Sequence, residues 1–543
     1  MTNQKYLSNL VVWGATVSSL LVTPFSFDPL NVSKFAVLII VGFSIYSLIL
    51  TNQEILNDNR YRLILIASLA FSILGLVSLG ATRVNLLQQI FGAAGRHTGF
   101  LTYLALTGML LGSAFISDKK LMERITKFLF ISGVISLTYG LIQVFDLDPL
   151  NWTNSFSPVI GFLGNPNFQS SFMAITATSV FSLILKTSVK LTWKLAYSVY
   201  ILLALFSIYR SNSQQGFLVF GAGFFVVLLF WIKGKSQSKA LISTYLLVSI
   251  VVAFATVLDI LQKAPWTSIL YKESVSNRGD MWRAGWRMSL DHPIFGVGFD
   301  NYGDWYRRYR DTAAISARGV DTISNTAHNV FLDISTSGGF PLLIAYLVIL
   351  GITVRAVLKL FVRTKSFDAP LAGIIGAWLA YIAQSLISIN QIGLAVWGWV
   401  FSGAIIGYEI YTRTDAQLSN QKTASNFGTV LIGGFLGLIV GLPPLISDVV
   451  YRNAIDSRQV FAVESSAYQW PQNGDRMIQV AATLRDNKLN EQAIKVARDA
   501  TKFAPERYEA WQVLGSIPII PDAEKAQAYA KLKELDPHNP DLK

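Results

Sequence analysis

The chain has 543 residues, of which 52% are hydrophobic and 14% are charged, whereas soluble domains carry about 25% charged residues. This composition excludes an ordinary soluble protein. The absence of cysteine excludes disulfides and thiolate metal sites. The net charge of +12 indicates the orientation of a membrane protein rather than a nucleic-acid interface, because the basic residues gather in loops between apolar runs.

Apolar runs of about 20 residues, the length that an α-helix needs to cross a bilayer, recur along the chain. We predict about thirteen membrane-spanning helices and therefore an all-α polytopic membrane protein. The first run is not followed by a small-residue cleavage site, so it is interpreted as a retained helix and not as a removed signal peptide. The predicted spans lie near residues 8–24, 33–50, 63–81, 99–116, 126–145, 168–185, 192–208, 216–232, 240–261, 340–361, 369–388, 392–411 and 427–446.

Lysine and arginine are enriched in the loops 117–127, 186–194, 233–239 and 355–365. Cytoplasmic loops carry an excess of these residues, so a cytoplasmic N-terminus places all four loops inside. An odd number of spans then puts the C-terminus outside, on the same side as the long polar segment 263–336.

The pattern divides the chain into four regions. Residues 1–262 form an N-terminal transmembrane block, and residues 263–336 form a large outside loop that carries the candidate site. Residues 337–446 supply the C-terminal transmembrane helices. From residue 447 to 543 the composition changes to that of a small soluble helical region.

The outside loop is rich in tryptophan, tyrosine and arginine. Ser276 or Asn277 can cap a helix that begins near Arg278, and Pro293 with the glycines after it should end that helix. Trp282 and Trp286 would share one face, one helical turn apart. We expect this amphipathic helix to lie along the membrane surface with its aromatic face down.

Arg278 suits a phosphate or pyrophosphate, because a guanidinium offers a planar fork of donors and stays charged. A position near a helix N-terminus adds a dipole that favours an anion. The alternative is a surface arginine neutralised by Asp280 or Asp304, and composition alone favours this alternative.

His328 lies in the sequence SNTAHNVF, where a polar loop meets an apolar run. An unperturbed imidazole can accept a proton at neutral pH, so His328 is a candidate general base; the alternative is a capping or packing role. His292 is interpreted as a helix-end residue, and His538 as a residue of the soluble tail. His97, beside Arg96, faces outside and can line the same chamber.

Motifs for other chemistries are missing. The sequence contains neither a Walker loop nor a serine on a nucleophile elbow. We predict no metal site and no cofactor.

The C-terminal region contains Pro471, Pro505 and Pro537 at spacings close to 34 residues. Helix pairs with this period are typical of tetratricopeptide repeats, which bind peptides or other domains. Fewer than three full units fit, so we expect the region to dock on the rest of the protein and to be a possible site for a protein partner. An irregular helical tail is the alternative.

The order of the loop motifs resembles that of a known family. R-x-x-x-W at 278–282 is followed by HP-x-x-G-x-G at 292–298, and then by His-Asn before a glycine-rich stretch. This pattern resembles the bacterial O-antigen ligase and O-antigen polymerase superfamily, which includes the bacterial protein O-oligosaccharyltransferases. The resemblance covers roughly residues 60–412 and is strongest over 276–340.

The resemblance implies a GT-C-like membrane fold and a metal-independent, inverting glycosyltransferase in the bacterial inner membrane, with its active site facing the periplasm. Its donor would be a glycan on undecaprenyl pyrophosphate, and its acceptor a hydroxyl of lipid A–core, a growing glycan or a protein. His328 would be the base, and Arg278 would bind the donor pyrophosphate. Many relatives have a Ser-Arg-Gly element where this chain has SNSQQG, so the second phosphate contact falls to Arg210 or Arg96. The supporting residues would be Asn329, Trp282 and His97.

Three other functions remain open. A polymerase or a protein-glycosylating enzyme would share the chemistry and differ in the acceptor. An anion transporter would place ionisable residues within its spans, whereas here most spans are free of charge. A scaffold built around the tail would leave the arginine- and tryptophan-rich loop unexplained.

Overall fold

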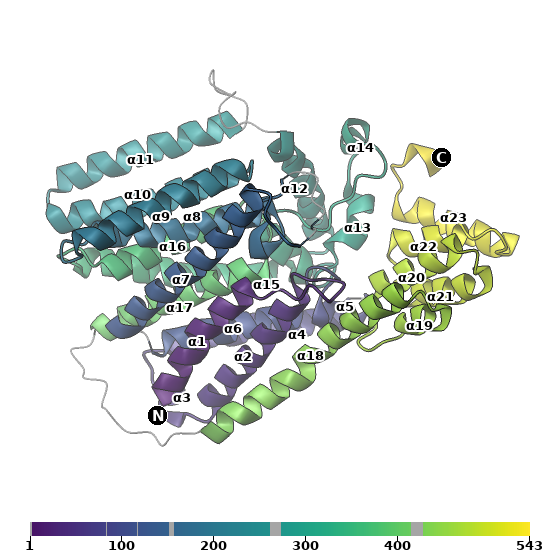
Figure 1. Ribbon diagram of the computed structural model, residues 1–543, viewed down its shortest axis with the longest axis horizontal. Helices are drawn as coiled ribbons and strands as arrows, with labels where there is room; N and C mark the ends of the chain where they lie inside the picture. The colour runs from purple at the N-terminus through teal and green to yellow at the C-terminus, as the bar shows by residue number, and fades with distance from the viewer. Residues whose placement is uncertain are drawn as a thin grey trace.

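The computed structural model describes residues 3–542 except 83, 117, 151, 153–156, 261–272 and 414–426. Throughout these described residues the regular elements are all helices, and no strand occurs. Most of the helices run roughly parallel or antiparallel in one large bundle, with a smaller group at one end (Figure 1). The predicted all-α fold class is confirmed.

Ten of the described helices are long and apolar enough to cross a membrane. They are α2 (Val32–Leu50), α4 (Arg62–Ala81), α7 (Lys119–Val144), α8 (Pro166–Ile184), α9 (Leu191–Arg210), α10 (Gln215–Lys235), α11 (Lys239–Ile260), α15 (Val330–Arg363), α17 (Ile392–Arg413) and α18 (Phe427–Ser457).

The other three predicted spans are also helices: α1 (Asn3–Leu20), α6 (Phe100–Ala114) and α16 (Ala369–Ser385). The last two are apolar but shorter than a typical span. The number thirteen therefore stays a prediction, although each predicted span coincides with a helix.

Close packing at small residues and buried hydrogen bonds holds the centre of the bundle together. Gly403 of α17 lies against the backbone of Leu110 in α6, where a Cβ atom would come within 2.0 Å of the Leu110 carbonyl oxygen. Trp397 of α17 donates from Nε1 to Ser19 Oγ at 2.7 Å. Without a hydrophobic force between helices in lipid, such close contacts and polar bonds supply the attraction.

Short helices and the loop helices lie between the spans. Within the long loop, α12 (Glu273–Asp291) is followed by α13 (Tyr302–Tyr309) and α14 (Thr312–Arg318). The remaining short elements of the bundle are α3 (Gln53–Asn57), α5 (Leu86–Phe91) and the 3₁₀ turn η1 (Gly161–Leu163). The loop helices gather at the end of the bundle opposite the N-terminus (Figure 1).

One predicted helix start is wrong. α12 already includes Glu273, so Ser276 and Asn277 lie inside the helix. α15 consists of two helical pieces joined at a kink, because Gly338 and Gly339 have non-helical backbone angles; the predicted span 340–361 corresponds to the second piece, and the first piece begins at Val330. Pro293 and the glycines end α12 after Asp291, as predicted.

The C-terminal helices form a compact group with its own hydrophobic core. α18 continues past residue 447 to Ser457 and leads into α19 (Val460–Ser466), so the change of composition falls inside a helix. The other elements of this group are α20 (Gly474–Asp486), α21 (Asn490–Phe503), α22 (Tyr508–Gly515), α23 (Asp522–Leu535) and η2 (Pro540–Leu542). The tetratricopeptide assignment stays a prediction.

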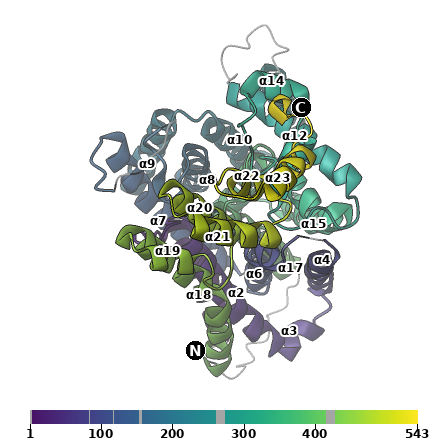
Figure 2. The ribbon, with the colours of Figure 1, turned by 90° about the vertical axis from the view of Figure 1, so that its right-hand side faces the viewer.

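The C-terminal helical group covers the same end of the bundle as the loop helices (Figure 2). Three arginines of α13 and its C-cap meet carboxylates of this group: Arg307 pairs with Glu509, Arg308 with Glu506, and Arg310 with Asp536. The end of the bundle that carries the candidate site is therefore also the end to which the C-terminal region is attached.

Candidate active site

Arg278 lies in the first half of α12 and is 6% exposed. Its guanidinium donates from Nη2 to Gln215 Oε1, at the start of α10, over 3.3 Å. Asp280 instead pairs with Arg283 and Arg318, and Asp304 lies 3.5 Å from Arg507.

Neither carboxylate that could have neutralised Arg278 therefore does so. Among the described side chains Gln215 is its only hydrogen-bond partner, and a neutral one. Burial lowers the pKa of Arg278 to about 10, which leaves the group charged at neutral pH. A buried cation with a neutral partner suits an anionic ligand.

His328 lies in the turn that precedes α15, with a left-handed backbone (φ 50°). Its backbone N–H donates to Thr326 Oγ1 at 2.9 Å, and its carbonyl accepts from Trp282 Nε1 at 3.5 Å. The next residue caps the helix: Asn329 Oδ1 accepts from the N–H groups of Phe331 and Leu332. The imidazole of His328 is thus not the cap.

The turn that carries His328 is bonded to two parts of the chain that carry arginines: Trp282, one helical turn after Arg278 on α12, donates to the His328 carbonyl, and Arg96 donates to the Asn325 carbonyl. Burial, then the positive charge of Arg278, then that of Arg96 lower the pKa of His328 to about 3. The imidazole is therefore neutral at physiological pH and can accept a proton at one ring nitrogen. The structure brings together Arg278, Arg96 and His328, which are far apart in sequence.

Arg96 has more partners than Arg278. Its Nη2 lies 3.1 Å from Asp300 Oδ1, and its Nη1 donates to the carbonyl of Asn325, three residues before His328. Asp300 is fixed in turn, because its Oδ2 accepts from the N–H groups of Ala93 and Thr98. Arg96 therefore joins the loop before α6 to the His328 turn, with its charge partly balanced.

Arg210 and His97 do not join this group. Arg210, in the last turn of α9, is exposed and lies 5.9 Å from the ring of Phe206. His97 Nε2 is 3.7 Å from Asp28 Oδ2, and its ring packs against Phe35. Three site candidates lie outside the long loop: Arg96, His97 and Arg210. Among the described contacts, only Arg96 is bonded to the loop before His328.

Two further residues of the site were missed by the sequence reasoning. Gln215 follows Gln214, the position that corresponds to the arginine of the Ser-Arg-Gly element. Its place beside that position was the signal in the sequence. Asp333 Oδ1 accepts from the N–H of Ala327 at 2.8 Å and so fixes the residue before His328. The sequence signal for Asp333 was its place in the first turn of a helix, where the helix dipole favours a carboxylate.

Within the described ranges no group of three or more histidine or acidic side chains is arranged to hold a metal ion. One Asp-x-Asp pair, Asp146 and Asp148, follows α7; Asp148 accepts hydrogen bonds from Tyr139 and Gln143, both at 2.9 Å.

Residues 199–347 match the family model described as O-antigen ligase. The matched segment contains Gln215, Arg278 and His328, whereas Arg96 and the C-terminal helical group lie outside it. No curated protein matches the chain. The match over residues 199–347 supports membership of this chain in the O-antigen ligase and O-antigen polymerase superfamily.

Proposed function

We propose that this membrane protein is a glycosyltransferase that moves a glycan from a polyprenyl pyrophosphate to an acceptor hydroxyl. The observation that carries the proposal is the gathering of Arg278, Arg96 and the neutral imidazole of His328 at one end of the bundle. The family match supports the ligase type of this reaction. Undecaprenyl pyrophosphate is the proposed carrier, and lipid A–core the proposed acceptor, on the periplasmic side of the inner membrane.

Arg278 is proposed to bind the pyrophosphate of the donor. The guanidinium can donate two parallel hydrogen bonds to phosphate oxygens. Negative charge on the pyrophosphate increases as its bond to the sugar breaks, so the interaction strengthens toward the transition state. Arg96, bonded to the carbonyl of Asn325 in the loop before His328, would supply a second positive charge.

His328 is proposed to be the general base. Its ring nitrogen takes the proton of the acceptor hydroxyl while the hydroxyl oxygen bonds to the anomeric carbon. The bond from that carbon to the pyrophosphate oxygen breaks, and its electron pair leaves with the pyrophosphate. Attack opposite the leaving group inverts the anomeric centre.

The donor also affects the base. Burial first, and then the charges of Arg278 and Arg96, lower the pKa of His328 to about 3, which makes it a weak base. A bound pyrophosphate would offset the two arginine charges and so raise the pKa by their share of the shift, and the base would strengthen once the donor is in place.

The test is the transfer rate of purified His328→Ala protein in lipid nanodiscs, with a defined polyprenyl pyrophosphate glycan and lipid A–core. General-base catalysis contributes about 10²–10⁴-fold, so we expect a loss of that size with unchanged folding. His538→Ala is the matched control, since His538 is an exposed residue of the C-terminal helical group. Near-normal transfer by His328→Ala contradicts the proposal, and anion flux into liposomes without a glycan lipid would favour a transporter instead.

A further inference from the structure

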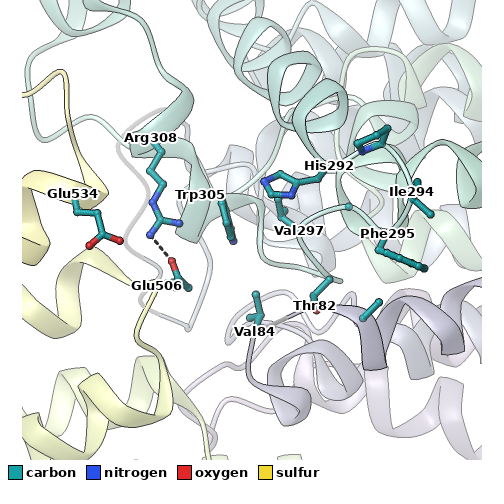
Figure 3. Close-up of a pocket in the computed structure, with 13 residues that line it drawn as sticks. Thr82, Val84, His292, Ile294, Phe295, Val297, Trp305, Arg308, Glu506 and Glu534 are labelled. Atoms are coloured by element: carbon teal, nitrogen blue, oxygen red, sulfur yellow. Dashed lines mark hydrogen bonds and ion pairs between the residues drawn. The ribbon is translucent and has the colours of Figure 1, made fainter.

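A cavity of about 630 Å³ lies beside the C-terminal end of α12, where His292 to Val297 line it. Its lining residues are drawn in Figure 3. Four parts of the chain line it: the end of α4, the loop after α12, α13 and the C-terminal helical group. Arg278 and His292 are fourteen residues apart, which corresponds to about 21 Å along a helix. The cavity is therefore separate from the Arg278–His328 group.

One wall of this cavity is apolar. Ile294 and Phe295, in the loop after α12, are 59% and 40% exposed, and Ala81 and Val84 lie across from them. An apolar stripe on α4 leads to this wall. Its members are large side chains at helical spacing that are each about half exposed: Ile66 53%, Leu69 60%, Ile73 48%, Leu76 58% and Val77 50%. In a membrane-spanning helix such a face contacts lipid chains, so the stripe connects the bilayer to the cavity.

The opposite wall is aromatic and charged. Arg308 stacks 4.5 Å above the ring of Trp305, and His292 lies edge-on to that ring at 5.0 Å. Arg308 also pairs with Glu506, and Glu534 stands beside them (Figure 3). The indole Nε1 of Trp305 has no hydrogen-bond partner among the described residues.

This wall suits a carbohydrate. Sugar hydroxyls are donors and acceptors at once, so they can bond to the carboxylates and the guanidinium together. An aromatic ring adds an apolar surface with a polar edge, which fits the mixed faces of a pyranose. The C-terminal helical group contributes both acids, Glu506 and Glu534, so it forms part of the site.

We propose that this cavity binds the carbohydrate headgroup of a membrane-anchored lipid whose chains lie along α4. The inference rests on the proposed function for the role of that lipid: it is either the acceptor glycolipid or the distal part of the donor glycan. The cavity itself is defined by its own residues and does not depend on the chemistry at His328.

The test uses the cysteine-free chain as a background for single thiols. Ile294→Cys places a thiol in the cavity, and Tyr529→Cys, on the exposed side of α23, is the control at 48% exposure. The rate of labelling by a membrane-impermeant maleimide is measured in nanodiscs of phosphatidylethanolamine and phosphatidylglycerol. The added probes are lipid A–core, an undecaprenyl-pyrophosphate-linked oligosaccharide, or an acceptor peptide.

A bound headgroup should slow labelling at position 294 about tenfold when the probe is at ten times its Kd, with no change at position 529. Protection by lipid A–core identifies an acceptor site, and protection by the donor oligosaccharide identifies a donor glycan site. Protection by neither glycolipid, or by the peptide alone, overturns the proposal.

Two further measurements separate this proposal from the proposed function. Protection should persist in Ile294→Cys protein that also carries His328→Ala, so loss of transfer with retained protection would leave the cavity assignment intact. Trp305→Ala, in an otherwise unaltered chain, should raise the KM for the bound lipid more than it lowers kcat. An unchanged KM for both lipids would contradict the cavity even if the cysteine variant were poorly folded.

Discussion

Arg278 and Arg310 are both buried arginines of the long loop, 6% and 1% exposed, but their surroundings differ. Arg310 Nη2 lies 2.5 Å from Asp536 Oδ2, and Asp536 is itself fully buried. Arg278 contacts the neutral amide of Gln215 and lowers the pKa of His328. A buried charge with an opposite charge beside it holds structure together, whereas one with neutral neighbours is available for a charged ligand.

The largest effect is expected when the paired arginine loses its partner. Asp536→Ala leaves Arg310 and Arg307 buried without this carboxylate, which typically costs about 3–5 kcal/mol. We expect faster hydrogen exchange in α13 and α23. Glu524→Ala, which removes an exposed pair between Glu524 of α23 and Arg498 of α21, should cost at most about 1 kcal/mol. Equal effects of the two substitutions would contradict the structural role of Asp536.

The same substitution at both arginines sharpens the comparison. Arg278→Gln should leave stability nearly unchanged, because it removes only a long bond to Gln215. It should reduce transfer about 10²–10³-fold, the usual cost of one donor to a developing charge. Arg310→Gln should instead lower the thermal stability, measured by hydrogen exchange of α13. A destabilised Arg278→Gln protein with normal transfer per folded molecule would reverse these assignments.

The pH profile tests the effect of Arg278 on the imidazole. Since the folded pKa of His328 is held below the ordinary value of 6.5, the imidazole stays neutral as pH falls to about 5, and kcat/KM for the donor should show no acid limb from it. The limb of kcat, which reports the donor-bound state, should lie at higher pH. In Arg278→Gln the pKa of His328 should rise, because the removed cation no longer disfavours protonation; burial and Arg96 still lower it, so kcat/KM should again show no acid limb above about pH 5. An acid limb of kcat/KM at the same pH as the limb of kcat would contradict the coupling between donor and base.

The smallest effect is expected at Arg210. This exposed residue contacts Phe206, so Arg210→Ala should change stability and transfer by no more than about 0.5 kcal/mol. The donor dependence of the transfer rate is the measurement. A loss as large as that of Arg278→Gln would show that Arg210 reaches the pyrophosphate when the donor binds.

Long apolar runs were sufficient to locate the spans, because the bilayer fixes their length and composition. Helix ends were less predictable. The first piece of α15 begins at Val330, where Asn329 caps it, and the predicted span 340–361 covers only the second piece, after the Gly338–Gly339 kink. At α12, Ser276 and Asn277 are residue types that often cap a helix, but here they lie within it.

The site itself was only partly predictable. Motif order related Arg278 to His328, whereas the third member, Arg96, was proposed only as one of two candidates. What decided between Arg96 and Arg210 is tertiary: Arg96 is bonded to the carbonyl of Asn325, beside the His328 turn. No local pattern in the sequence GRHTG contains that information.

The kink in α15 has a mechanical consequence. Gly339 adopts a left-handed backbone (φ 72°), and a Cβ atom there would come within 2.4 Å of the backbone of Ile294. The Phe340 N–H donates to the Pro293 carbonyl, and the Val297 N–H donates to the Thr336 carbonyl. These two hydrogen bonds hold the loop after α12 against the first piece of α15, which begins at Val330, two residues after His328. The loop that lines the cavity and the turn that holds the imidazole are thereby connected through a single short helical piece.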